Sequence, residues 1–173
     1  MKKQSGFTLV EVLVVISITV LLSAVLIVYN RSGESQIVLL KEQAKIIGIL
    51  LRAKNLALQI YSPDGGGVVC GYGVHFDIAK NEFLIFKDLA DLCSSSDNKY
   101  SGPNEDFEKH KIDSRLKFLS LELADLLFIP PDPVVAIDGD INKKGSFEIV
   151  IGSVDGAGEK KIKVNNFGQI TAQ

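Results

Sequence analysis

The residues GFTLVEVLVVISITVLLSAVLIV, numbers 6 to 28, decide how this chain of 173 residues is built. From Phe7 to Val28 the single charged residue is Glu11. About 20 apolar residues span the hydrocarbon core of a bilayer as a helix, which satisfies all of its own backbone groups there. We therefore predict a membrane-spanning helix over residues 7–29.

The charges that flank this run predict its orientation in a membrane. Lys2 and Lys3 precede the run, and the first charge after it is Arg31. Because basic residues stay on the cytoplasmic side, the N-terminus is expected inside. The rest of the chain is then periplasmic or extracellular, anchored in the cytoplasmic (inner) membrane by one pass.

Three interpretations of this segment are possible, and they differ in whether they explain the position of Gly6 and the charge of Glu11. A secretory signal peptide has a shorter apolar region followed by a small-residue cleavage site, whereas here Gly6 comes before the run. A plain signal anchor explains the lysines but not Glu11, because a carboxylate in lipid costs on the order of a few kcal/mol. A cut between Gly6 and Phe7 would create a charged α-amino group, and that amine could pair with Glu11 of a neighbouring subunit to set the register of an assembly.

The stretch KKQSGFTLVEVLVVISITVLLSAVLIVYN, residues 2–30, resembles the class III signal and helix of type IV pilins and type II secretion pseudopilins. The resemblance implies that residues 1–6 are a leader removed by prepilin peptidase after Gly6. It also implies that Phe7 becomes the N-methylated terminus and that Glu11 supports assembly. The implied partners are other pilin or pseudopilin subunits, the inner-membrane assembly platform and membrane lipid. Major pilins commonly carry a proline near the end of this helix, and its absence from residues 7–62 suits a minor subunit.

A second helical stretch is predicted over residues 35–61, with a break or a bend near Gly33 and an end at SPDGGG, residues 62–67. Apolar residues recur in it at steps of three and four, which predicts a face that packs on the core of the domain: Ile37, Leu40, Ala44, Ile47 and Leu51.

Short β-rich segments follow the second helix. We predict strands over 68–76, 81–87, 115–121, 125–129, 133–138, 146–153 and 160–171, and an exposed loop over 92–106. A helix followed by many strands predicts an α+β fold in which an antiparallel β-sheet packs on the helix, as an exported domain over residues 30–173. This layout, with CGYGVHF (70–76) and VNNFGQI (164–170), resembles the GspH/FimT family of minor pseudopilins and minor pilins.

The exported part contains two candidate structural sites, a cysteine pair and a possible calcium loop. Cys70 and Cys93 can form a disulfide in an oxidising compartment or remain free thiols, while a zinc site would need four close ligands. Asp138, Asp140 and Asn142 alternate as in the first half of a calcium loop. The twelfth position of that loop is Ile149 instead of glutamate, which favours an ordinary turn over calcium.

Five lysines near the C-terminus raise the question of DNA: Lys143, Lys144, Lys160, Lys161 and Lys163. A net charge of −2 gives no general case for nucleic acid, and lysines also protect sheet edges from aggregation. His75 and His110 fit no catalytic arrangement, so we expect neither an enzyme nor a cofactor. The leading hypothesis is a structural subunit of a pilus or pseudopilus; the alternative is a binding module for DNA or a surface, displayed on such a fibre.

Overall fold

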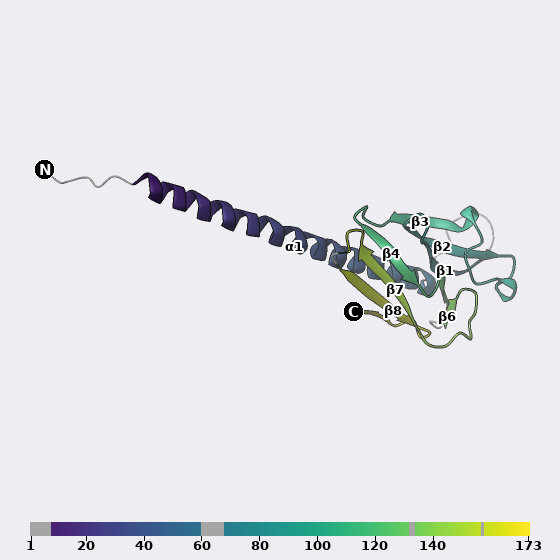
Figure 1. Cartoon of the computed structure of the whole chain (residues 1–173). Coiled ribbons are helices and arrows are strands. Elements are labelled where there is room, and N and C mark those ends of the chain that lie inside the picture. The colour runs from purple at the N-terminus through teal and green to yellow at the C-terminus, as the bar shows by residue number, and fades with distance from the viewer. Residues whose placement is uncertain (1–7, 60–67, 132–133, 157) are drawn as a thin grey trace.

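The computed structural model describes residues 8–59, 68–131, 134–156 and 158–173, which form a long helix followed by a β-rich globular part (Figure 1). The helix, α1, covers Leu9–Leu58. The strands are β1 (Val68–Asp77), β2 (Glu82–Ala90), β3 (Asp106–Lys111), β4 (Leu116–Leu121), β5 (Asp125–Ile129), β6 (Val134–Ile137), β7 (Ser146–Ser153), β8 (Glu159–Asn165) and β9 (Ile170–Ala172). The predicted α+β fold is confirmed.

Helix α1 is continuous over 50 residues. Thr8 caps its N-terminus, because the Thr8 hydroxyl accepts a hydrogen bond of 3.2 Å from the backbone N–H of Glu11. The helix passes through Gly33 without interruption, so the predicted break there is wrong. A single glycine costs only about 1 kcal/mol in a helix interior, which does not end a helix that is favoured on both sides.

The strands form two antiparallel sheets instead of the single sheet that was predicted. The five-stranded sheet has the order β3-β2-β1-β5-β6, and the four-stranded sheet has the order β4-β7-β8-β9. Residues 78–81 form a hairpin turn between β1 and β2, close to the gap of residues 77–80 between the two predicted strands. The predicted last strand is divided in two by a turn in which the Asn165 side chain accepts hydrogen bonds from the N–H groups of Phe167 and Gln169.

Strand β3 was missed because its sequence, DFEKHK, has no apolar alternation. It lies at the edge of the five-stranded sheet, where only β2 pairs with it. Charged side chains are common on such edges because they discourage pairing with other chains. The predicted loop over 92–106 is otherwise irregular, apart from two short 3₁₀ turns.

The predicted core-facing side of the helix is also wrong. Ile37, Leu40, Ala44 and Leu51 are exposed, and Ile47 is only partly buried. The buried stripe lies on the opposite side and comprises Val38, Leu39, Ile46, Leu50, Ala53 and Ala57. Polar residues at 42 and 43 hid this stripe in the sequence.

Gln43 and Glu42 are buried because each has polar partners. The Gln43 side-chain amide donates hydrogen bonds to the carbonyl oxygens of Lys161, at 2.8 Å, and Gln173, at 3.1 Å. Glu42 forms an ion pair of 2.8 Å with Lys45. Gln43 therefore ties the helix to the four-stranded sheet, and the helix packs on this sheet and on β1 and β5.

Candidate functional site

The first candidate site is the half of α1 that extends away from the globular part (Figure 1). Residues Leu9–Leu26 have a mean hydropathy of 2.7, and none of this segment is buried within the chain. By length and composition it can cross a membrane. An apolar surface of this extent, exposed along a helix, needs lipid or protein to cover it.

The hydroxyl groups of this segment have hydrogen-bond partners within the helix. The segment also contains one charged residue. The hydroxyls of Ser17, Thr19 and Ser23 donate to carbonyl oxygens of the preceding turn, at 2.7–3.0 Å. Glu11 is the single charged residue between Thr8 and Leu26. It lies in the first turn, where the positive end of the helix dipole favours a carboxylate. Gly6 and Phe7, the predicted cleavage residues, lie outside the described residues.

The Thr8–Glu11 contact was overlooked at the sequence level although its signal was present. A threonine three residues before a glutamate is the spacing of a capping box, which marks a helix start. Glu11 therefore has two candidate roles, one in helix capping and one in pairing with another subunit. These roles can be separated, because glutamine preserves the capping function and removes the charge.

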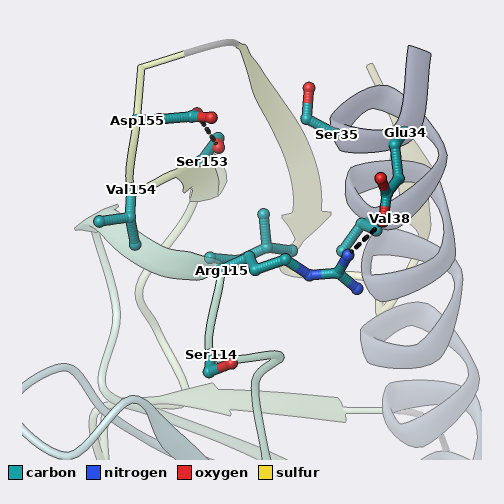
Figure 2. A pocket seen from close by; sticks show the side chains of 9 residues that line it. Glu34, Ser35, Val38, Ser114, Arg115, Ser153, Val154 and Asp155 are labelled. Carbon is teal, nitrogen blue, oxygen red and sulfur yellow. Dashed lines mark hydrogen bonds and ion pairs between the residues drawn. The ribbon is translucent and has the colours of Figure 1, made fainter. Parts of the chain in front are cut away.

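The second candidate site is a cavity of about 480 Å³ at the point where α1 enters the globular part (Figure 2). One wall is formed by Glu34, Ser35 and Val38 of the helix. The opposite wall comes from two segments, Ser114–Leu116 and Ser153–Asp155. On the far side, Val154 is exposed and the Ser153 hydroxyl bonds the Asp155 carboxylate (Figure 2).

Arg115 joins the two walls of this cavity. Its guanidinium donates to Glu34 at 2.9 Å (Figure 2). It also donates to Asp113 at 3.0 Å. Arg115 also holds the pKa of the Asp113 carboxyl down to about 2, through hydrogen bonds from its side chain and its backbone N–H. Glu34 and Arg115 are 81 positions apart, so no local pattern in the sequence could have predicted this contact.

Cys70 and Cys93 are joined by a disulfide in the structure. Their sulfur atoms are 2.09 Å apart and their Cα atoms 5.2 Å apart. The bond attaches the segment after β2 to strand β1. This segment is also held by Tyr100, whose hydroxyl donates to Asp106 at 2.8 Å. Of the two alternatives that the sequence left open for the cysteines, the structure has the bonded one.

Two of the candidate calcium residues, Asp138 and Asp140, serve as local hydrogen-bond acceptors, and Asn142 is a donor to one of them. One Asp138 carboxylate oxygen accepts from the N–H groups of Ala124 and Asp125, and the other pairs with Lys143 at 2.8 Å. Asp140 accepts from the backbone N–H of Asn142 at 2.7 Å. Among the described residues, no group of three or more His, Cys, Asp or Glu side chains is arranged to hold a metal ion.

Two of the C-terminal lysines and both histidines also have structural partners. Lys161 and Lys163 both pair with Glu148, at 3.4 and 2.9 Å, so these lysines and an acid share one surface. His75 lies 2.7 Å from the Asp125 carboxylate and packs on the ring of Tyr100. Burial lowers the pKa of His110, whose ring stacks on Phe83.

Comparison with known proteins agrees with both parts of this arrangement. Residues 1–27 match the family described as the prokaryotic N-terminal methylation motif. No curated protein matches the chain. The fold is similar to the solved structure of the minor pseudopilin EpsH from the type 2 secretion system of Vibrio cholerae, with a TM-score of 0.52 and 12% identity. That match covers 78% of this chain and 95% of the other.

The chain thus combines a prepilin-type methylation motif with a pilin-like α+β fold. The motif covers residues 1–27, which include the whole apolar segment Leu9–Leu26 of α1. The structural likeness, at this identity, concerns the fold.

Proposed function

We propose that the protein is a minor pilin or pseudopilin, a structural subunit of a type IV pilus or type II secretion pseudopilus. Residues 1–6 are the leader, residues 7–29 the membrane and assembly helix, and residues 30–173 the exported domain. The observation that carries the proposal is the unburied apolar half of α1 with a single carboxylate in its first turn. The methylation motif over the same residues supports it.

In this proposal the protein is made with its N-terminus in the cytoplasm and anchored in the inner membrane. Prepilin peptidase cuts between Gly6 and Phe7, and Phe7 is N-methylated. The assembly platform then moves the subunit into a fibre, where protein replaces lipid around residues 9–26. The protein's role is structural, and no catalytic step is assigned to it.

Glu11 pairs with the N-terminal amine of a neighbouring subunit in the assembled state. A carboxylate in an apolar layer is costly unless it is paired, and an amine at a neighbour's new N-terminus is a partner of the right charge. The pair then favours one alignment of the helices over others. Capping by Thr8 and the helix dipole stabilise Glu11 before assembly.

Three variants of the full chain separate the two roles of Glu11. Glu11→Gln removes the charge and keeps a polar side chain of the capping-box type, Glu11→Leu removes both the charge and the polar side chain, and Thr8→Val removes the oxygen that caps the Glu11 N–H. Ser17→Leu is a matched control, because it makes the segment more apolar and leaves Glu11 in place. The measurement is co-purification with partner subunits from cells that make the whole assembly.

We expect Glu11→Gln and Glu11→Leu to lose partner subunits equally, with Thr8→Val and Ser17→Leu close to the wild type. All variants should still be cut after Gly6, which mass spectrometry of the mature N-terminus checks. If Glu11→Gln recruits partners as well as the wild type, the ion pair is wrong. A mature N-terminus anywhere after Val28 would contradict the processing step.

A further inference from the structure

We propose that the cavity at the point where α1 enters the globular part binds the headgroup of a membrane phospholipid. Arg115 binds the phosphate, and the carboxylates of Glu34 and Asp155 bind an amine on the same headgroup. The inference rests on the proposed function in one respect, because it takes α1 to be the membrane anchor of the chain. It concerns the subunit while it is held in the membrane, before assembly.

The cavity lies at the end of the globular part from which the apolar half of α1 leaves (Figure 1). The Gln43 side chain bonds the Lys161 carbonyl, and a Cβ atom built at Gly158 would meet the Gln36 amide nitrogen at 2.7 Å. Three residues of strand and seven residues of helix both measure about 10 Å. The chain from Lys161 back to Gly158 therefore runs alongside α1 toward its apolar half.

The distance between this cavity and the hydrocarbon of a bilayer is short. The apolar run ends at Val28, six residues before Glu34, which corresponds to about 9 Å of helix. The headgroup layer on one side of a bilayer is about 5–8 Å thick. Ser153 donates its N–H to the Gly158 carbonyl at 3.0 Å, and the turn Val154–Gly156 extends beyond this pair. The mouth of the cavity therefore borders the headgroup layer.

The charged groups of the cavity match a headgroup that carries both a phosphate and an amine. Arg115 is 55% exposed, and its bonds to Glu34 and Asp113 use one N–H each of Nε, Nη1 and Nη2. Because a guanidinium has five N–H donors, it can also donate to a phosphate oxygen. The carboxylates of Glu34, Asp113 and Asp155 outnumber this one cation, which disfavours a simple anion and favours a ligand that brings a positive charge of its own.

The apolar groups beside the cavity suit the edge of a membrane. Val154, in the turn, is 57% exposed and lines the cavity. Lys117 and Leu119 lie on the other face of the same turn, and both are exposed. A basic side chain next to apolar ones is typical of the interface between lipid and water. The cavity volume of about 480 Å³ is in the range of small-molecule sites, so it can hold a headgroup while the acyl chains stay in the bilayer.

The test uses the full chain in nanodiscs of equal parts phosphatidylethanolamine and phosphatidylcholine, with a photo-crosslinking amino acid at Val154. Both lipids carry the phosphate, but the choline nitrogen has three methyl groups and donates no hydrogen bond to a carboxylate. Mass spectrometry identifies the lipid that becomes attached. We expect position 154 to capture phosphatidylethanolamine at least about threefold over phosphatidylcholine, the factor of a hydrogen bond to a charged group. Ile141, an exposed residue that precedes the opposite end of β7, is the control site and should capture neither lipid.

Two arginine variants separate the phosphate contact from general attraction to the membrane. Arg115→Ala should lower the capture of both lipids at position 154 at least about fivefold, because it removes the donor to the phosphate. Arg52→Ala is the matched control, since Arg52 is also an exposed arginine and pairs with Glu108 at 3.0 Å farther along α1. It should leave capture unchanged. Circular dichroism and the yield of protein in nanodiscs check that both variants fold.

A third variant tests the amine contact. Glu34→Gln combined with Asp155→Asn should abolish the preference for phosphatidylethanolamine, because it removes both carboxylates that bind the amine. Equal capture of the two lipids by the wild type would overturn the inference, as would undiminished capture in Arg115→Ala or capture at position 141 equal to that at position 154.

A crosslinker at Val20 in the same nanodiscs tests the membrane anchor by itself. The absence of any attached lipid at this position would overturn the proposed function. Capture of lipid at position 20 without capture at position 154 would overturn only the headgroup site.

Discussion

The two halves of helix α1 both carry many apolar residues, but they lie in very different surroundings. Between Leu9 and Leu26 the helix is apolar on all sides and buries nothing within the chain. Between Val38 and Ala57 it buries one stripe against two sheets and exposes the other. The difference shows that apolar residues on this helix are arranged for two kinds of partner: the chain's own sheets on one side of the second half, and other molecules everywhere else.

The comparison can be tested first at two leucines. Leu50→Ala, in the buried stripe, should lower the free energy of unfolding of the globular part by about 2–5 kcal/mol, because it leaves a cavity in the core. Leu21→Ala, in the exposed half, should leave that free energy unchanged. Both variants are measured by denaturant unfolding of the full chain in detergent, followed by the circular dichroism of the β-sheets. Equal losses would mean that the two halves are not independent.

The disulfide offers the next largest effect, and it is confined to the globular part. Replacing both Cys70 and Cys93 by serine should lower the free energy of unfolding by roughly 3 kcal/mol. The disulfide closes a loop over 23 positions and so restricts the unfolded chain. The same denaturant titration measures the loss, and reduction of the wild type should reproduce it. Membrane insertion, followed by fractionation, should be unaffected, since no cysteine lies in residues 1–29. If the double variant no longer enters the membrane, insertion of the apolar half of α1 depends on the disulfide of the globular part, which would contradict the separation of the two regions.

The smallest effect is expected at the boundary between the two halves. Arg115→Ala removes the contacts with Glu34 and Asp113. Because these contacts lie on the surface, the free energy of unfolding should fall by less than about 1 kcal/mol. Arg115 lowers the pKa of Asp113 to about 2. Because the pKa of Asp113 is lower in the folded state, its ionised carboxylate stabilises the fold at pH values above its ordinary pKa near 4. This contribution is lost as the pH falls from about 4 toward 2.

The difference in stability between wild type and Arg115→Ala should therefore shrink over that acid range. Denaturant titrations at a series of pH values measure it. A difference that grew as the pH fell would contradict the assigned pairing of Asp113 with Arg115.

The sequence was sufficient for the parts of the fold that depend on local patterns. The apolar run with Glu11, the hairpin at residues 78–81 and the strands with buried, β-branched residues could all be predicted. The core-facing side of the helix could not, because residues 37–58 carry two apolar stripes and only contacts with the sheets select one. Gln43 is buried through bonds to Lys161 and Gln173, far away in the chain, and therefore looked like a surface residue.

The same limit applies to the candidate sites. Glu11 could be singled out as a candidate because a single charge in an apolar run is conspicuous in the sequence, and its role in assembly stays a prediction. The Arg115–Glu34 contact depends on the tertiary fold, as does the separation of the strands into two sheets. The exposed stripe on the second half of α1 emerged from the disagreement between the predicted and the observed core-facing side.

We propose that other subunits cover the exposed half of α1, and a crosslinker at Val20 is the most direct probe of this contact. The full chain with a photo-crosslinking amino acid at this position is made in cells with the whole assembly and in cells that lack the other subunits. We predict attachment to the apolar helix of another subunit in the first cells only, and its loss when Glu11→Leu is added. Attachment to lipid alone in both kinds of cell would contradict the claim, and the segment would then be a membrane anchor and nothing more.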